Sequence, residues 1–283
     1  GQIKCHESIF EVQDTQKKGD HYLHLGFMKS GKLTLKDEVS AEIDSKERKR
    51  IKSNHSGTHL LHAALREVLG EHVEQKGSLV DQSKLRFDFT HSKSIETEEI
   101  TKIENLINEQ ILLNSETITE ILPIEEAIER GAIAFFGDKY GDEVRVLNIG
   151  DNFSVELCGG THVSMTGEIE LLKITSESSV SAGIRRIEAV TGEAANHLLD
   201  HLEHIYCSIS NELLIDDFDT REGIEALEYI RFLENEMSVF AKLLNCSQDQ
   251  VLTKIIQMKE ENITISNKLE SRQSEFETYE SHT

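Results

Sequence analysis

The sequence predicts an α+β fold that continues into a long helical tail. Three observations support this class. Short apolar stretches alternate with turn residues over the first 44 residues, strands and helices then interleave without a regular βαβ rhythm up to Gly192, and helical spacing continues from there almost to the end. We therefore expect three segments, at residues 1–44, 45–192 and 193–283.

The first segment is expected to hold four short strands. They are Phe10–Val12, Tyr22–Leu25, Leu33–Leu35 and Val39–Ile43. About forty residues are few for an independent core. We therefore predict a small sheet or partial β-barrel that packs on the segment after it.

The second segment alternates helices and strands. A helical apolar pattern opens at Asn54 and stops at Gly70, and an amphipathic helix is expected over Thr97–Leu113. Pro123 fits the first position of a short helix that runs through Arg130. The strands, which we expect to form a hairpin and a mixed sheet, are His72–Val80, Leu85–Phe89, Glu116–Leu122, Val144–Leu147, Phe153–Leu157, Ile169–Thr175 and Ile184–Val190.

The third segment is helical, and its spacing from Gln248 onward is partly that of a coiled coil. Such a tail offers a surface for self-association. It also carries 18 acidic and 7 basic residues from Ala195 to Thr283, which is half of the excess negative charge of the chain.

Composition limits the partners and the compartment. A net charge of −22 argues against a protein that grips nucleic acid over its whole surface, so any contact with phosphates needs a local basic patch. Four scattered cysteines do not suggest a disulfide framework, no apolar stretch is long enough to cross a bilayer, and no signal peptide is evident. These features favour the cytoplasm and no membrane partner.

Two clusters of cations are candidates for phosphate contacts. They are Arg48, Lys49, Arg50 and Lys52, ahead of the Asn54 pattern, and Arg185 and Arg186 in a predicted strand. A solvated helix face is the alternative for the first cluster. Adjacent strand residues point to opposite faces, so we expect one arginine of the second cluster to be held in a structural ion pair.

A metal site is predicted from two short motifs. His55 and His59 are four apart in a helical pattern, so both imidazoles project from one face, whereas His62 is expected to belong to a polar stripe. Ser56 stands where zinc proteases carry a catalytic Glu. Cys158 and His162 flank a Gly-Gly loop after a strand, and together the four residues make the nitrogen and sulfur set that zinc prefers. The alternative for Cys158 is a small buried apolar residue.

These motifs and several others share a resemblance. They are Asp14–Lys17, His55–His62, His72–Ser78, Leu85–Phe89, Cys158–His162 and Gly183–Ala189. Together they resemble the editing region of alanyl-tRNA synthetase and its freestanding relatives, and the resemblance covers most of the chain.

The resemblance implies a zinc-containing editing domain at 45–192, preceded by a barrel. The implied activity is hydrolysis of the ester that joins serine, with glycine as a second substrate, to the acceptor end of tRNA-Ala. It also implies Zn²⁺ at His55, His59, Cys158 and His162, and it makes Gln75 the first non-metal candidate in the editing pocket. An exposed strand glutamine is the alternative for Gln75. We expect a fragment that lacks the ATP-binding aminoacylation core.

Two other functions remain open: a structural zinc module for protein interaction, and a different zinc-dependent deacylase such as a threonyl-type editing domain. Four protein ligands are typical of structural zinc, whereas catalytic zinc usually keeps one position open, so both roles of the metal remain open as well. No carboxylate beside the ligands offers itself as a general base, which favours a metal-bound or substrate-positioned water.

Overall fold

The protein divides into two compact units in the computed structural model, residues 1–192 and 193–283. The structure describes residues 1–19, 21–133, 141–213 and 226–280. The α+β class is confirmed. The division of the chain into three functional segments stays a prediction. Within the described ranges, no helix is long and apolar enough to cross a membrane.

The first unit begins with an open antiparallel sheet. Its strands are β1 (Gln2–Cys5), β2 (Ser8–Lys18), β3 (His21–Ser30) and β4 (Ser40–Glu42), in the order β3-β2-β1-β4. The strand predicted at Leu33–Leu35 is wrong. The Asp37 carboxylate accepts hydrogen bonds from both the backbone N and Oγ1 of Thr34, each at 2.7 Å, and this side chain fixes a turn instead.

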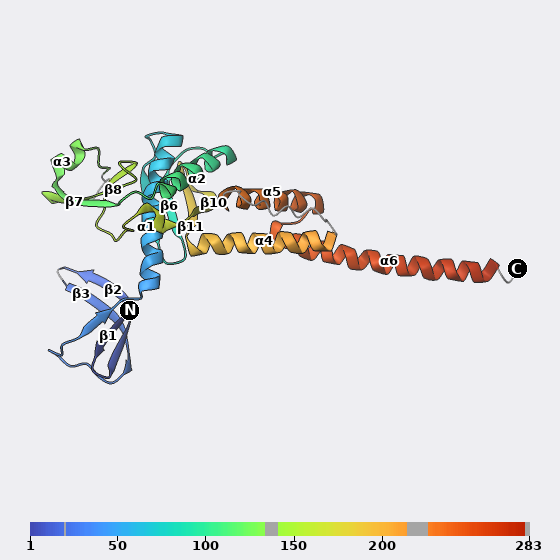
Figure 1. Ribbon diagram of the computed structural model, residues 1–283, viewed down its shortest axis with the longest axis horizontal. Coiled ribbons are helices and arrows are strands. Elements are labelled where there is room, and N and C mark those ends of the chain that lie inside the picture. The colour runs from blue at the N-terminus through green and yellow to red at the C-terminus, as the bar shows by residue number, and fades with distance from the viewer. Residues whose placement is uncertain (20, 134–140, 214–225, 281–283) are drawn as a thin grey trace. The chain divides into compact units, whose positions relative to one another are not determined.

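Helix α1 (Ser45–Leu69) is the central element of the first unit. It begins nine residues before the predicted Asn54, because Asp44 caps it: Oδ1 of Asp44 accepts from the backbone N of Lys46 at 2.9 Å and of Glu47 at 3.0 Å. It ends at Gly70, as predicted. In Figure 1, α1 lies beside β6, β11 and α2, and it contacts all three.

Two antiparallel sheets surround this helix, rather than one mixed sheet. The first contains β5 (Gln75–Val80), β6 (Leu85–Thr90), β10 (Leu172–Ser181) and β11 (Ile184–Thr191), in the order β10-β11-β6-β5. The second contains β7 (Ile118–Pro123), β8 (Glu143–Ile149) and β9 (Ser154–Leu157). The predicted hairpin is confirmed as β5 and β6.

Two further helices belong to this unit. Helix α2 (Thr97–Leu112) buries Ile103, Ile107 and Ile111 as its amphipathic pattern predicts. Helix α3 (Ile124–Glu129) follows Pro123, which occupies the cap position rather than the first helical position. One apolar core joins α1, α2 and both sheets, with Leu60, Phe87 and Leu147 among its members. The middle of α1 is consequently buried on every side.

The second unit is helical. It consists of α4 (Glu193–Leu213), α5 (Ala226–Leu244) and α6 (Val251–Glu280), and its core contains Ile209, Met237 and Val251. Residues 214–225 and 281–283 of the predicted tail lie outside the described residues. The helical character is confirmed, whereas coiled-coil pairing and self-association stay predictions.

Candidate metal centre

The structure brings the four predicted ligands together. His55 and His59 lie one turn apart on α1, and Cys158 and His162 lie in the loop that follows β9. One ligand atom from each residue lies within 4.8 Å of those of the other three, and Cys158 Sγ is 3.6 Å from His55 Nε2. These residues could hold a metal ion.

The hydrogen bonds of the cluster fit a bound cation. His59 Nε2 and His162 Nε2 are buried and have no hydrogen-bond partner within the described part of the chain. Buried polar atoms without a partner cost free energy and need an explanation, and a cation held by the four ligands would provide one. Three imidazoles and one thiolate are the donor set expected for zinc and other borderline metals.

The charges of the cluster also suit a cation. Burial alone would raise the pKa of the Cys158 thiol, but the neighbouring imidazoles of His162, His55 and His59 lower it to about 3. Burial would lower the pKa of His59, yet the nearby Glu156 carboxylate and Cys158 raise it to about 10, so the surroundings favour a positive charge at this place, and a metal ion would take the position of the Nε2 proton. Metal ligation by sulfur requires the thiolate, which this environment stabilises.

Glu156 corrects two of the expectations drawn from the sequence. Its carboxylate is buried beside the ligands and accepts hydrogen bonds from His59 Nδ1 at 2.7 Å and from His62 Nδ1 at 2.9 Å. The sequence offered no carboxylate beside the ligands as a general base; Glu156 does lie there, and whether it acts as a base stays untested. His62 is also not part of an exposed polar stripe: it is 1% exposed and its ring packs on Phe87. Alternation along β9 was the available signal, because Glu156 is two residues before Cys158 and so shares its face.

The loop that carries Cys158 and His162 is fixed by Arg145, which the sequence did not single out, and by Ser56, for which it suggested no such contact. Nη1 of Arg145 on β8 donates to the carbonyls of Cys158 at 2.7 Å and Gly160 at 2.8 Å. Oγ of Ser56 accepts from the backbone N of Val163 at 3.1 Å. A serine at position 56 therefore anchors the second motif to the first.

Gly160 is required by the close approach of His55. A Cβ on Gly160 would lie 2.2 Å from His55 Cε1, whereas a Cβ on Gly159 would meet no atom within 4 Å. The two glycines of the loop thus differ: the second makes room for a ligand and the first does not.

The sequence matches one protein family model and several known proteins, all of them tRNA synthetases or their domains. Residues 144–188 match the family model described as the threonyl and alanyl tRNA synthetase second additional domain. The chain is 56% identical over 200 residues to the alanine–tRNA ligase of Saccharophagus degradans, covering 71% of this chain and 23% of that protein. It is 45% identical over 262 residues to the alanine–tRNA ligase of Dechloromonas aromatica, covering 92% and 30%. The alanine–tRNA ligase of Methylobacillus flagellatus is 46% identical over 254 residues, covering 89% and 29%.

The chain belongs to the alanine–tRNA ligase family. It spans less than a third of the length of these relatives. The family model that it matches covers β9, β10, all of β8 except its first residue and the first part of β11, and so includes Cys158 and His162.

Gln75, the residue that the resemblance to alanine–tRNA ligases singles out, is the first residue of β5. It lies opposite Phe89 in the β5–β6 pair, and Phe89 is fully buried in the core that includes α1. Directly paired residues of antiparallel strands point to the same face, so Gln75 lies on the α1 side of the sheet. Its side chain is partly buried and makes no hydrogen bond to the described residues. Its role in this alanine–tRNA ligase region stays a prediction.

The arginine pair of β11 is held more firmly than predicted, because both side chains form ion pairs. Arg185 pairs with Glu177, and its Nη2 donates to Glu177 Oε2 at 2.5 Å. On the opposite face, Nε and Nη2 of Arg186 each donate to the Asp88 carboxylate at 2.7 Å. Both arginines are thus engaged within the chain, and phosphate binding by them stays a prediction.

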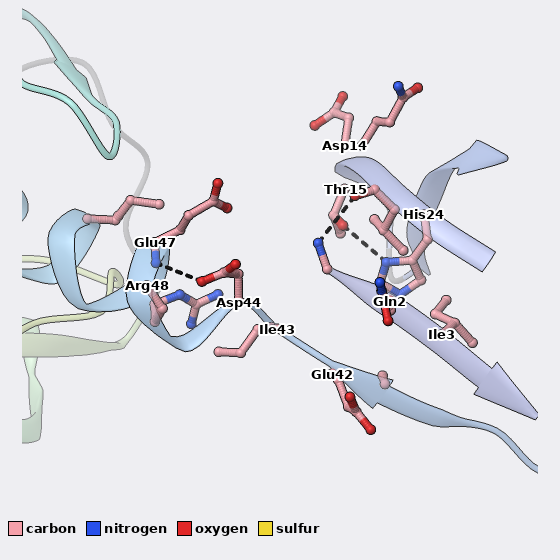
Figure 2. A pocket seen from close by; sticks show the side chains of 15 residues that line it. Gln2, Ile3, Asp14, Thr15, His24, Glu42, Ile43, Asp44, Glu47 and Arg48 are labelled. Carbon is pink, nitrogen blue, oxygen red and sulfur yellow. Dashed lines mark hydrogen bonds between the residues drawn. The ribbon is translucent and has the colours of Figure 1, made fainter. Parts of the chain in front are cut away.

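The basic cluster at the start of α1 is more exposed to solvent than the arginine pair of β11. Lys49 is exposed and pairs with Glu170 at 3.1 Å, and Arg50 is also exposed. Arg48 lines a cavity of about 380 Å³ between the first sheet and α1. Figure 2 shows Arg48 there beside Asp44 and Glu47 of the same helix start. Phosphate binding by these residues and by Lys52 stays a prediction.

Proposed function

We propose that this region of an alanine–tRNA ligase hydrolyses tRNA-Ala that has been charged with the wrong amino acid. Serine is the main substrate that we propose, and glycine is the second. The observation that carries the proposal is the buried cluster of His55, His59, Cys158 and His162, with its partnerless Nε2 atoms, in a relative of alanine–tRNA ligases.

An enzyme that attaches alanine to tRNA needs such a site, because it cannot exclude serine well by binding alone. Serine differs from alanine by one hydroxyl, and an apolar pocket rejects an added hydroxyl by only about a hundredfold. A second site that hydrolyses the wrong ester is the general remedy when binding discriminates this weakly.

We assign the cluster to Zn²⁺, because its three imidazoles and one thiolate match the usual ligands of zinc. When bound there, zinc would act as a Lewis acid toward the ester or an attacking water. Both a catalytic and a structural role for the metal are compatible with four protein ligands, and the chelator experiment below separates them.

The residues of the chain itself have distinct parts in this proposal. The Cys158 thiolate and the buried Glu156 carboxylate provide negative charge that balances a divalent cation. Gln75 positions the amino acid or the water. The cations Arg48, Lys49, Arg50 and Lys52 contact phosphates of the tRNA acceptor end, whereas the ion-paired Arg185 and Arg186 contribute less. The described cysteines are all unpaired, in keeping with a protein of the reducing cytosol.

A deacylation assay tests the proposal. The 283-residue protein should release serine from Ser-tRNA-Ala much faster than alanine from Ala-tRNA-Ala. A chelator should abolish this activity and zinc should restore it if the metal is catalytic, whereas a structural metal would make the loss follow unfolding. Elemental analysis should find about one zinc per chain, and a His55→Ala plus Cys158→Ala variant should lose it.

Three results would redirect the proposal. A zinc-loaded protein with no deacylase activity would favour a structural module for protein interaction. Preference for serine attached to tRNA-Thr over tRNA-Ala would favour a threonyl-type editing domain. Full metal content in the double variant would refute the assignment of the ligands.

A further inference from the structure

One buried carboxylate outside the ligand set joins two histidines of α1. The side chain of Glu156 is 2% exposed, and its two oxygens are used separately: Oε2 accepts from His59 Nδ1 and Oε1 from His62 Nδ1. Ser154 Oγ lies 3.3 Å from Oε1 and adds a third donor. Since a carboxylate can only accept, both imidazoles carry their proton on Nδ1 toward Glu156.

The direction of this proton determines what His59 can offer to a metal. With Nδ1 as the donor, Nε2 is the only ring nitrogen left to bind a metal, and that atom is buried, partnerless among the described residues and part of the ligand cluster. A metal-bound histidine commonly donates its other ring N–H to a carboxylate, and this contact fixes both the tautomer and the ring orientation. Glu156 stands in that relation to His59.

His62 explains why the carboxylate itself does not rotate. It lies three residues after His59 on the same face of the helix, so one carboxylate can reach both rings. Its own ring is packed at 5.2 Å, between centroids, from Phe87 of β6. Oε1 is thereby bound to a side chain that the core holds in place, and Oε2 remains aimed at His59.

We propose that Glu156, held in place by His62, is a positioning residue that orients His59 and sets the metal affinity of the cluster. The inference rests on the metal site of the proposed function but not on its substrate. Glu156 also supplies a second negative charge close to the Cys158 thiolate. Removing that charge would leave a divalent cation with one charge uncompensated in a buried site.

The test is zinc affinity in Glu156→Gln, measured by competition with a chelator. Loss of such a contact typically costs about 10- to 100-fold in metal affinity, and we expect a loss in this range. The matched control is Glu104→Gln. Glu104 of α2 is also a buried carboxylate, 1% exposed, but it accepts from the backbone N of Ile174 at 2.8 Å and pairs with Lys173, away from the ligands. Its loss should lower stability and leave zinc affinity unchanged.

A second measurement separates orientation from general damage to the fold. Nitrogen-15 spectra of the histidines in the metal-free protein should show His59 protonated at Nδ1 in the wild type and a changed proton distribution in Glu156→Gln. Glu156→Asp should restore part of the affinity. His62→Phe, which keeps an aromatic ring beside Phe87 but removes the donor, should weaken zinc binding less than Glu156→Gln does.

Wild-type zinc affinity in Glu156→Gln, or an equal loss in Glu104→Gln, would overturn the inference. If Glu156→Gln does not fold, unchanged affinity in His62→Phe overturns it as well. The proposed function fails separately: a protein that binds zinc but hydrolyses no aminoacyl-tRNA would contradict the editing proposal and leave the effect of Glu156 measurable.

Discussion

The two halves of helix α1 differ in exposure: the first, up to Lys52, is largely exposed to solvent, and the second, after Lys52, is largely buried. The first half presents cations to solvent, and its Lys49–Glu170 pair joins side chains that are 61% and 44% exposed. Exposed pairs of this kind contribute little to stability. The second half is enclosed by the core. Its buried polar atoms have partners or lie in the ligand cluster, except Nε2 of His62, which is buried without a partner among the described residues. Burial makes the geometry of the second half informative, whereas the charges of the first half indicate a binding surface only in outline.

Among the variants that test this difference between the halves, Gly160→Ala should have the largest effect, a loss of zinc affinity in the buried half. In Gly160→Ala the new Cβ would meet His55 Cε1 at 2.2 Å, so the ring or the loop must move out of the cluster. We expect zinc affinity to fall by at least about tenfold, as for other disruptions close to a ligand, and deacylation to fall with it. Gly159→Ala is the matched control, because its Cβ meets nothing within 4 Å. Equal zinc affinity in the two variants would contradict this account of the loop.

Gln75→Ala tests the substrate side of the buried half. If the amide positions the amino acid or the water, its loss should lower the rate of serine deacylation about 10- to 100-fold, while zinc content and thermal unfolding stay as in the wild type. The neighbouring Lys76→Ala serves as the control, because Lys76 pairs with Glu74 at the surface. Unchanged rates for both Ser-tRNA-Ala and Ala-tRNA-Ala would identify Gln75 as an ordinary strand residue.

Charge reversal in the exposed half of α1 should weaken tRNA binding and leave zinc affinity unchanged. About three phosphate contacts would give a log–log salt slope of roughly −2 to −3, and Lys49→Glu with Arg50→Glu should make that slope shallower and weaken binding. Lys268→Glu with Arg272→Glu changes the net charge equally on exposed residues of α6. If both double variants bind tRNA alike across salt concentrations, the first half of α1 is only a solvated surface.

The difference between the halves also explains what the sequence could predict. Helical spacing puts His55 and His59 on one face, and a Gly-Gly loop after a strand joins Cys158 to His162. The two motifs together, and their resemblance to a known family, predicted the four-residue cluster. The fold class and the stripe of α2 likewise depend on local periodicity. Such patterns survive in the structure because burial selects the same faces that the spacing defines.

What escaped prediction depends on pairing between distant residues. Glu156 is one of 52 acidic residues, and nothing local distinguishes it until β9 is placed beside α1. Arg145 becomes important only because β8 runs next to the loop of Cys158. The loop at Leu33–Leu35 was mistaken for a strand because the Asp37 side chain, not the apolar alternation, determines its backbone.

The smallest expected effect is on stability and concerns Arg186. This arginine is held in a partly buried ion pair, whereas Lys49 and Arg50 in the first half of α1 are exposed. Its two hydrogen bonds to Asp88, together with its charge, hold the pKa of that carboxyl below its usual value, against a burial that raises it. Because the pKa in the folded state is the lower one, the stabilisation is fully present above the unfolded value of about 4 and is lost as the pH falls through the folded value. At pH 7 Arg186→Gln should therefore lower the free energy of unfolding slightly, because an ion pair that is partly exposed contributes little to stability. The difference in the free energy of unfolding between the wild type and Arg186→Gln should become smaller as the pH falls from 4 to 3. Urea denaturation at a series of pH values measures it. Asp88→Asn lacks the titrating group and should show no such narrowing when compared with its own double variant with Arg186→Gln. A gap that stays constant from pH 7 to pH 3 would mean that the Asp88 pair does not hold Arg186, and would return this arginine to the candidates for phosphate contact.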